Sequence, residues 1–422
     1  MDPHRFVTHS LQDARILRII SAAIDAVDPY LAVQRNLPAI EGRIFGLGIG
    51  KAAIPMMDAL AERIPLASGL AVTKFASGQS RSLYTVMEGG HPIPDESSLQ
   101  AGERALEFVS SLGEDDTLVC LISGGGSALM TAPRVPLEDM QNLTSLLLAS
   151  GARIDEINTL RRQLDRIKGG GLAGATNARI VSLILSDVVG NPLEAIASGP
   201  TAPNPTTRED ARAILEKYGL ERQVPDSILK NMHSGSLLPD FLEQAPGLQN
   251  VKNIIIGDNK LAAQAALEQA EGEGFHAEIL MNDLQGEARE VGVLLANKLR
   301  DELTICPRPF CLIAGGETTV TVKGKGKGGR NQELALSALH ELSGLEKVML
   351  VALATDGDDG PTDAAGAVVT GESARRAAAL GLDAADSLSR NDAYPFFQKL
   401  GDLIKSGPTG TNVNDLIFLF AI

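Results

Sequence analysis

"TLVCLISGGGSALM", residues 117–130, joins a continuous apolar run, three consecutive glycines and the start of a helical pattern. A strand that is apolar on both faces is typical of a parallel sheet covered by helices on both sides. Three other segments of the first half have the same form: "RIFGLGIG" (43–50), "GLAVTKF" (69–75) and "RIVSLILSDVVG" (179–190). The pattern predicts an α/β domain with a parallel sheet in three layers.

The second half has its own alternation of strands and helices. We expect strands at 251–257, 309–316, 319–324, 347–357, 366–370 and 414–420. The sheet is expected to be mixed, because 316–324 resembles a strand that continues into a loop and 366–370 a short extra strand. "SGSLLPDFLEQAPGLQN" (234–250) mixes proline, glycine and polar residues without a sustained period, which indicates a boundary. The predicted domains are 1–245 and 246–422.

Composition restricts the class of function. The chain has 422 residues and a formal net charge of -15, which argues against a broad nucleic-acid surface because such a surface needs a basic stripe. Charges interrupt the apolar pattern of residues 1–29, which predicts an amphipathic helix and no signal peptide, and no apolar run is long enough to span a membrane. The three cysteines lack C-x-x-C spacing, so we expect a reduced, cytoplasmic protein, either a monomer or a homodimer.

The glycine turn of the opening stretch is a candidate phosphate site. Glycines at the carboxyl end of a strand allow several main-chain N–H groups to converge on phosphate oxygens, with a hydroxyl on either side. A tight turn alone seldom needs three glycines, so we favour nucleotide binding. The residues of this candidate site are Ser123, Gly124, Gly125, Gly126 and Ser127.

The turn after the first strand carries a cation. Gly48 and Gly50 precede Lys51, which opens a helical pattern, and together they could bind an anion or form an ordinary turn with a solvated lysine. The turn matches neither the P-loop nor the dinucleotide fingerprint, and the next strand ends at Lys74 where an acidic ribose partner would stand. Lys168, beside a second glycine run, is a further candidate cofactor contact.

Aspartates follow strands in both halves. Asp187 and Asp356 each come after an apolar run, and either could hold Mg²⁺ or accept a hydroxyl proton at the sheet edge. For Asp358 and Asp359 we prefer plain turn chemistry. His91 precedes a proline and is a candidate substrate contact, although such a histidine is more often structural.

A basic, glycine-rich stretch precedes a helix in "VKGKGKGGRNQELAL" (322–336). Arg330 is placed at the helix start, where Asn331 could cap the helix and contact substrate. The lysines at 323, 325 and 327 are expected to attract anionic substrates or to form a mobile flap, with the glycines providing freedom to close. Cations, glycine turns and strand-end carboxylates together are the groups that phosphoryl transfer needs.

The ordered motifs resemble those of class II glycerate kinases, whose C-terminal part is the MOFRL domain. The similarity covers nearly the whole chain. The motifs include "GIGKA" (48–52), "GGHPIPDESS" (89–98), "LISGGGSAL" (121–129), "LSDVVGNPLEAIASGPT" (185–201), "GKGGRNQELAL" (326–336), "TDGDDGPTDAAGA" (355–367) and "TNVNDL" (411–416). Departures include Asn191 and Asn204, where the family often has aspartate.

The resemblance implies a Rossmann-like N-terminal domain and ATP- and Mg²⁺-dependent phosphorylation of D-glycerate, usually at the 2-hydroxyl, in a cleft between the domains. It places the family's important lysine at Lys51 and its important arginine at Arg330. Two alternatives stay open: an NAD(P)-dependent hydroxypyruvate reductase, as some members have been labelled, and a non-catalytic module that binds a phosphosugar.

Overall fold

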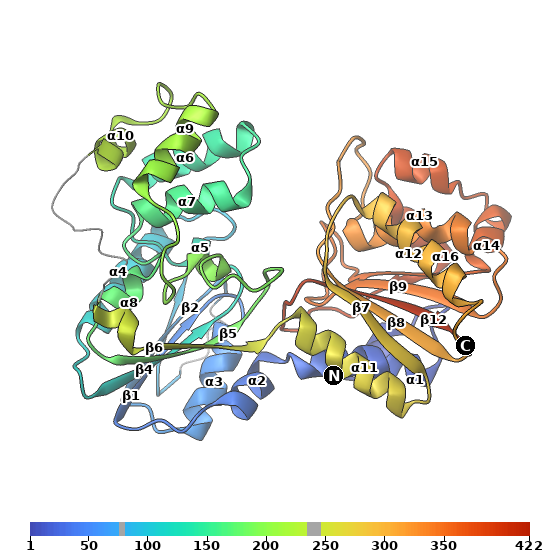
Figure 1. Ribbon diagram of the computed structural model, residues 1–422, viewed down its shortest axis with the longest axis horizontal. Helices are drawn as coiled ribbons and strands as arrows, with labels where there is room; N and C mark the ends of the chain where they lie inside the picture. Colours follow the sequence, from blue (N-terminus) through green and yellow to red (C-terminus); the bar gives the residue numbers. More distant parts are fainter. Residues whose placement is uncertain (76–80, 234–245) are drawn as a thin grey trace. The chain divides into compact units, whose positions relative to one another are not determined.

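The chain forms two compact units in the computed structural model, which describes residues 1–75, 81–233 and 246–422. The parallel-sheet unit comprises Pro29–Ser186 and Asn191–Ile256. The mixed-sheet unit comprises Met1–Asp28, Asp187–Gly190 and Gly257–Ile422. The predicted fold class, two α/β domains with a parallel and a mixed sheet, is confirmed (Figure 1).

The parallel-sheet unit contains six strands in the order β3-β2-β1-β4-β5-β6. All pairings from β3 to β5 are parallel, and Ile49 at the end of β1 stands opposite Ile122 at the end of β4. These two strands therefore deliver their following turns to the same edge. The strand bounds are β1 Arg43–Ile49, β2 Ser68–Thr73, β3 Thr85–Glu88, β4 Asp116–Ile122, β5 Arg179–Leu185 and β6 Val251–Gly257.

Some helices of this unit have a second apolar core of their own. α6, α7, α9 and α10 lie together beyond the sheet (Figure 1) and bury Leu143, Leu160 and Leu215 among themselves. The helices of the unit are α2 Pro29–Asn36, α3 Ala53–Arg63, α4 Glu96–Ser110, α5 Gly126–Leu129, α6 Leu137–Ala149, α7 Ile154–Leu164, α8 Gly171–Gly174, α9 Arg208–Lys217 and α10 Asp226–His233.

The mixed-sheet unit has strands in the order β11-β10-β9-β12-β8-β7, of which only the β7–β8 pairing is parallel. Its strands are β7 His276–Leu284, β8 Phe310–Gly316, β9 Val348–Ala354, β10 Gly366–Thr370, β11 Leu403–Ile404 and β12 Asp415–Ala421. Its helices are α1 Ala14–Ala26, α11 Asn259–Gly272, α12 Ala288–Glu302, α13 Arg330–Leu342, α14 Ser373–Ala379, α15 Ala384–Ser389 and α16 Ala393–Leu400. α12 and α13 cover one face and α1 and α11 the other (Figure 1).

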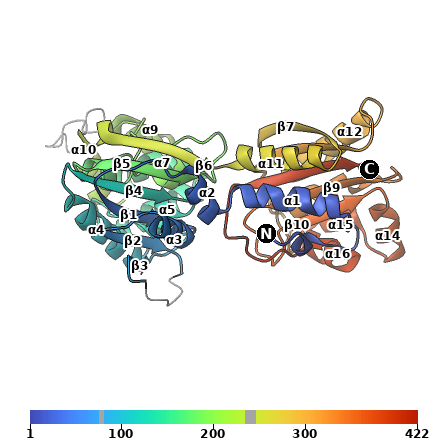
Figure 2. The same ribbon diagram turned by 90° about the horizontal axis from the view of Figure 1, so that it is seen from below.

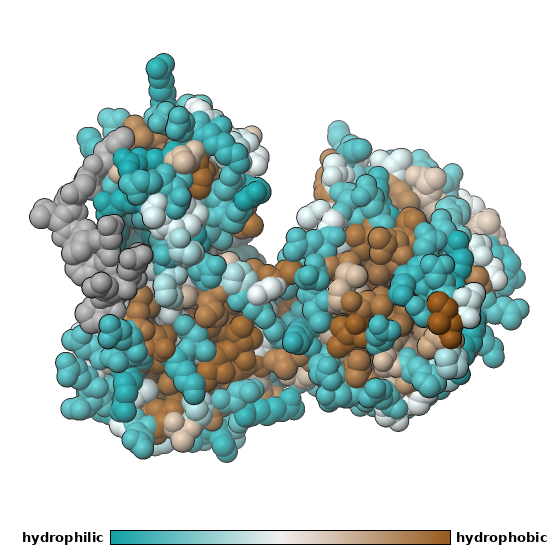
Figure 3. Space-filling view, viewed as in Figure 1, coloured by the Kyte–Doolittle hydropathy of each residue, from teal (hydrophilic) through white to brown (hydrophobic). Residues whose placement is uncertain are grey.

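The edge strand β7 borders exposed apolar surface. Leu280 and Met281 of β7 and Val293 and Leu294 of α12 line a shallow groove, and Leu294 is exposed. Figure 3 shows apolar side chains in this region on the face turned toward the viewer.

The first helix, α1, belongs to the mixed-sheet unit, although residues 1–245 were predicted to form one domain. Most of the predicted boundary segment, 234–245, lies outside the described residues. Asp13 caps α1 by accepting a hydrogen bond from the main-chain N–H of Arg15. The apolar face of α1, with Ile16 and Ile20 fully buried, packs against α11, and the two helices lie side by side (Figure 2). Residues 1–28 therefore complete the mixed-sheet unit, because that unit supplies the apolar surface that α1 covers.

One strand prediction was wrong in its sheet and another in its existence. The strand predicted at 251–257 is confirmed as β6, but it lies beside β5 in the first sheet, so the change of unit falls at the end of this strand. Residues 319–324 form no strand, because Thr319 makes only a single bridge to Glu287 and the N–H of Thr321 donates to the Glu287 carboxylate.

Within the described residues, none of the helices has the length and apolar character that a membrane span requires.

The assignment of α1 predicts where a core substitution acts. Ile20→Ala should lower the free energy of unfolding of the mixed-sheet unit by roughly 3 kcal/mol, since Ile20 is fully buried. Hydrogen exchange should become faster in α11 and remain unchanged in β1 and β4. The matched control is Leu60→Ala in α3, where the fully buried side chain belongs to the parallel-sheet unit and the pattern should reverse. Faster exchange in β1 and β4 of the Ile20 variant would contradict the assignment.

Candidate active site

The turns after β1 and β4 are joined by hydrogen bonds. The N–H of Lys51 donates to the carbonyl of Gly124 at 2.9 Å, and the N–H of Ser123 donates to that of Ile49 at 2.9 Å. The Ser123 hydroxyl accepts from the N–H of Ala52 at 3.0 Å. The two glycine motifs thus form one double turn at the carboxyl edge of the sheet.

Lys51 and His91 flank the glycine turn. Gly125 has φ +85°, and a Cβ atom there would lie 3.1 Å from Cδ2 of His91 and 3.3 Å from Cγ of Lys51. A side chain at this position would collide with both groups and strain the backbone. Lys51 is exposed, so its ammonium group is available to a ligand.

The surroundings of His91 favour its neutral form. Burial lowers the pKa of the imidazole, and the positive charges of Lys51 and Lys74 lower it further. At neutral pH the ring can therefore both donate and accept a hydrogen bond. The structure brings His91, a weak candidate from the sequence, to Lys51 and the glycine turn.

Three predicted contact residues have structural roles. A Cβ atom on Gly48 would lie 2.7 Å from Cγ of Met57, so this glycine allows α3 to approach β1. The Ser123 hydroxyl is buried and serves the main chain, as described above. The N–H of Gly50 donates to the carbonyl of Val72. None of these three offers a free polar side-chain atom to a ligand.

Lys168, expected at the cofactor, is buried in an ion pair. Its Nζ lies 2.5 Å from Oδ2 of Asp165, and burial lowers the pKa of the ammonium group. The glycines that follow Lys168 pack against the "IASG" segment, since the N–H of Gly169 donates to the carbonyl of Ser198. Ser198 in turn shares a hydrogen bond of 2.7 Å with the hydroxyl of Ser127.

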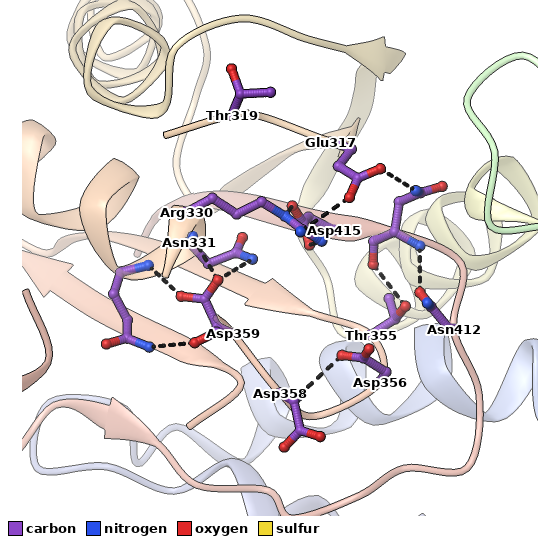
Figure 4. A network of polar contacts seen from close by, with 12 residues as sticks. Glu317, Thr319, Arg330, Asn331, Thr355, Asp356, Asp358, Asp359, Asn412 and Asp415 are labelled. Carbon is purple, nitrogen blue, oxygen red and sulfur yellow. Dashed lines mark hydrogen bonds and ion pairs between the residues drawn. The ribbon is translucent and has the colours of Figure 1, made fainter. Parts of the chain in front are cut away.

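Arg330 is the first residue of α13 and is held between two carboxylates (Figure 4). Its Nε and Nη2 donate to the two oxygens of Asp415 at 2.5 and 2.9 Å, and its Nη1 lies 3.0 Å from Oε1 of Glu317. Three of the five guanidinium N–H groups are engaged in this way. The side chain is 30% exposed, so the remaining two can reach a ligand.

The register of the sheet explains this cluster. Asp415 begins β12 and stands opposite Gly316 of β8 and Ala354 of β9. The residues that follow β8 and β9 therefore meet the start of β12 at one edge. Glu317 directly follows β8.

Asp359 caps α13, although the sequence predicted Asn331 for this role. Its Oδ1 accepts from the N–H of Asn331 at 3.1 Å and its Oδ2 from the N–H of Gln332 at 2.9 Å. Gly329 occupies the N-cap position, and Asn331 is buried inside the first turn. Burial and the charge of Asp415 raise the pKa of Asp359 to about 7. The prediction of plain turn chemistry for Asp359 was wrong, because its carboxylate caps a helix. Asp358 is exposed, and turn chemistry stays the prediction for that residue.

Asn414 connects the strand-end aspartates. Its Nδ2 donates to the main-chain oxygen of Asp187 at 2.8 Å and to Oε2 of Glu317 at 3.1 Å. Its main-chain oxygen accepts from the N–H of Thr355, the residue before Asp356. Asn414 thus ties the main chain at Asp187 and at Thr355, next to Asp356, to Glu317, the ion-pair partner of Arg330, in the mixed-sheet unit.

The donors of this network suit a small hard cation in part. Mg²⁺ is commonly held by one or two carboxylates together with substrate phosphates and water. Asp187 and Asp356, both half-buried, provide two such groups. Among residues 1–75, 81–233 and 246–422, no three acidic, histidine or cysteine side chains are grouped to hold a metal by themselves.

The basic lead-in to α13 is packed against residues 390–394. Asn391 accepts through Oδ1 from the N–H groups of Lys323 and Gly324, and the Lys327 ammonium lies 4.2 Å from the centre of the Tyr394 ring. A Cβ atom on Gly324 would lie 2.0 Å from the carbonyl oxygen of Arg390. The glycines are thus explained by close backbone packing, which differs from the expected mobile flap.

Comparison with known proteins matches two regions of the chain. Residues 15–233 match a family described as a domain of unknown function, DUF4147, and residues 310–415 match the MOFRL family. The chain belongs to the glycerate kinase family with a MOFRL domain. Lys51 lies in the first matched region and Arg330 in the second.

Relatives of this family cover nearly the whole chain. A protein of Pyrococcus horikoshii named glycerate 2-kinase is 42% identical over 95% of each chain. One of Thermotoga maritima named D-glycerate 2-kinase is 44% identical over 95% of this chain and 96% of its own. A crystal structure of a Thermotoga maritima glycerate kinase superimposes with a TM-score of 0.89, at 42% identity, over 96% of this chain and 98% of the other. A protein of Agrobacterium vitis named putative hydroxypyruvate reductase is 40% identical over 94% of this chain and 92% of its own.

Sequence reasoning missed the carboxylates that hold Arg330. Asp415 lies in the "TNVNDL" motif, which was quoted without a role for this residue. Glu317 follows an apolar strand, as Asp187 and Asp356 do, and that position was the available signal.

The raised pKa of Asp359 predicts a pH dependence of stability. The folded state holds this proton up to about pH 7, whereas an unfolded aspartate loses it near a pKa of about 3.9. Between these values the folded chain binds more protons, so this group makes the free energy of unfolding fall as pH rises, by up to about 1.4 kcal/mol per pH unit. Asp359→Asn should flatten this fall in denaturant titrations between roughly pH 5 and 7.

The exposed neighbour provides the control for this experiment. Asp358→Asn should retain the pH dependence of the unmodified protein, because Asp358 makes no contact with the helix start. An unchanged slope in the Asp359 variant would show that its carboxyl group does not carry the effect.

Proposed function

We propose that this chain transfers the γ-phosphoryl group of ATP to the 2-hydroxyl of D-glycerate and releases 2-phospho-D-glycerate. The observation that carries the proposal is the full-length similarity to proteins named glycerate 2-kinase, which includes both polar clusters described above. A cytoplasmic location fits the three unpaired cysteines, two of which are buried.

Lys51 is proposed to neutralise phosphate oxygens of ATP at the glycine turn. The main-chain N–H groups of Gly124 and Gly125 donate to no group in the described part of the chain, so both can donate to an anion. Lys51 adds a full positive charge beside them, and His91 adds a neutral ring that can donate to an oxygen. Phosphoryl transfer depends mainly on such positioning and charge neutralisation.

Arg330 is proposed to stabilise the charge of the transferring phosphoryl group. Its two carboxylate partners fix the guanidinium plane before substrate arrives, and two N–H groups remain for phosphoryl oxygens. A cation that is already oriented pays little reorganisation cost when charge develops on those oxygens.

Asp187 and Asp356 are proposed to share two tasks. One would hold Mg²⁺ with nucleotide oxygens, and the other would accept the proton of the 2-hydroxyl; the assignment between them stays open. When bound, Mg²⁺ neutralises phosphate charge. Asn414 supports both positions through the hydrogen bonds described above.

A second candidate function is the reduction of hydroxypyruvate by a nicotinamide cofactor, which the name of the Agrobacterium vitis relative raises. The ribose end of a dinucleotide usually meets an acidic residue after the second strand, and here Lys74 follows β2. Oxidation of NADH or NADPH by hydroxypyruvate would favour this candidate.

Phosphorus NMR of the purified protein with D-glycerate and MgATP tests the proposal directly. We expect a resonance of 2-phosphoglycerate together with ADP. A 3-phosphoglycerate resonance would correct the position of transfer, and absence of any phosphorylated acid would overturn the kinase assignment.

Removal of either cation should abolish most turnover. Lys51→Met should lower kcat by about 100-fold to 1000-fold without loss of stability, because the side chain is exposed. Lys252→Met, also exposed in the same unit, should leave kcat unchanged. Near-normal kcat in the Lys51 variant would refute its role.

Arg330 needs a variant that protects the fold. Arg330→Met leaves the buried Asp415 without its partner, which destabilises the protein. The double variant Arg330→Met/Asp415→Asn should recover stability and remain inactive. If the double variant regained activity, the role of Arg330 would be to neutralise Asp415, and its proposed contact with the phosphoryl group would be wrong.

Metal titration separates the two aspartates. Among Asp187→Asn and Asp356→Asn, the variant of the metal ligand should require more Mg²⁺ for half-maximal rate. The variant of the base should lose kcat at every Mg²⁺ concentration with an unchanged requirement. Asp358→Asn is the control, and wild-type behaviour of both test variants would contradict the shared tasks.

A further inference from the structure

A small hollow opens beside the glycine turn in the parallel-sheet unit. It lies between the "SGGGS" segment, the start of α6 and the end of α7. Its lining residues are Ile93, Pro94, Ser127, Thr131, Leu137, Met140, Gln141, Thr144, Arg161 and Lys168. Two of them are cations and none is acidic.

The charge of Lys168 is already neutralised. Oδ2 of Asp165 accepts from Nζ of Lys168 and from the hydroxyl of Thr131, each at 2.5 Å, and Oδ1 accepts from the N–H of Ile167 at 2.8 Å. This carboxylate is fully buried and its oxygens are satisfied. The Asp165–Lys168 pair therefore contributes no net charge to the hollow.

Arg161 is left as the uncompensated cation. It lies in the last turn of α7, is half-buried, and makes no hydrogen bond or ion pair within the described residues. The adjacent Arg162 differs in this respect, because Nε donates to Asn204 at 2.9 Å and Nη2 to Thr159 and Thr206 at 3.2 Å. Arg162 thus holds loops together, whereas Arg161 presents free donors to the hollow.

An unpaired guanidinium in a half-buried position is unfavourable without an anion. Burial lowers the pKa of Arg161, and Asp165 opposes this only at longer range, because its oxygens are used by other donors. Arginine presents planar pairs of N–H groups that match a carboxylate. A ligand with one carboxylate would supply the missing charge.

We propose that Arg161 binds the carboxylate of the acceptor acid: the carboxylate of D-glycerate enters this hollow, whose volume of about 20 Å³ admits that group, and its hydroxyl groups lie outside it toward Ser127. The inference rests on the proposed kinase function and extends it to the recognition of substrate. Ser127 belongs to the glycine turn assigned to nucleotide phosphates, which places acid and phosphate on the same segment.

The walls favour a small acid over a nucleotide phosphate. Leu137, Met140 and Ile93 make three sides apolar, and the amide nitrogen of Gln141 is used by the carbonyl of Pro94 at 2.7 Å. Apolar walls offer few donors to a doubly charged phosphate, and a volume of about 20 Å³ admits a carboxylate group. Arg161 provides donors for one carboxylate, and the hydroxyl of Ser127, which shares a hydrogen bond with Ser198, can make one further hydrogen bond to a hydroxyl group.

Arg161→Met and Arg161→Lys test this inference in the full-length protein. Arg161→Met should raise KM for D-glycerate by about 100-fold, through loss of charge-assisted hydrogen bonds, and leave KM for ATP within about twofold. Arg161→Lys should fall between, since it keeps the charge and loses the planar donor pair. Glycerol, which lacks the carboxylate, should be an equally poor acceptor for all three proteins.

Arg134→Met is the matched control. Arg134 is exposed, and like Arg161 it interacts with Asp165 at long range only. Its removal should leave both KM values unchanged. Thermal unfolding without ligand should be unaltered or shifted upward in Arg161→Met, whereas a structural role for Arg161 would lower the unfolding temperature.

Calorimetry with D-glycerate alone separates this inference from the kinase assignment. Binding to the wild type and loss of binding in Arg161→Met support the carboxylate site, even if no phosphorylated product forms. Equal binding to both proteins, an unchanged KM for D-glycerate, or a rise confined to KM for ATP would each overturn it. Failure of the wild type to bind D-glycerate would overturn the carboxylate site alone, because product formation in the phosphorus NMR experiment decides the kinase assignment.

Discussion

The pairing of Arg330 with Asp415 fixes the candidate catalytic cluster of the mixed-sheet unit. Asp415 begins the central strand β12, opposite Gly316 and Ala354, so the ion pair attaches α13 to three neighbouring strands at one edge. Glu317 adds a second carboxylate from the end of β8. A buried charge pair of this kind is costly to break, because either partner alone would be left desolvated. The sheet register therefore sets the orientation of the guanidinium group before any ligand binds.

The cations of the chain fall into two kinds that are distinguished by their partners. Lys168 and Arg330 are balanced by carboxylates, which makes them parts of the framework, although Arg330 retains donors for a ligand. Lys51 and Arg161 have no acidic partner among the described residues and face the glycine turn or the hollow beside it. In a protein with a net charge of -15, a cation without an acidic partner leaves a local positive charge that an anionic ligand would neutralise.

The sequence was sufficient where local pattern decides the structure. Alternating apolar runs and helical patterns predicted both sheets, and Lys51 and the "SGGGS" turn were each expected to bind anions, although their hydrogen-bonded contact was not predicted. It was insufficient where a residue's partner lies far along the chain. Asp359 caps a helix that begins about thirty residues earlier, and Asn391 pins the basic lead-in. Arg161 could not be told from Arg162 by pattern, since only the tertiary partners of Arg162 separate them.

The placement of α1 has a consequence for the order in which the protein is made. The apolar face of this helix, which includes Ile16 and Ile20, packs mainly against α11, which follows the entire parallel-sheet unit in the sequence. A nascent chain emerges from its N-terminus, so these isoleucines leave the ribosome well before the surface that covers them exists. During synthesis the apolar face of α1 therefore lacks its partner α11 while the parallel-sheet unit is translated. Helix α1 is thus translated before the parallel-sheet unit and is buried only after α11 has been made.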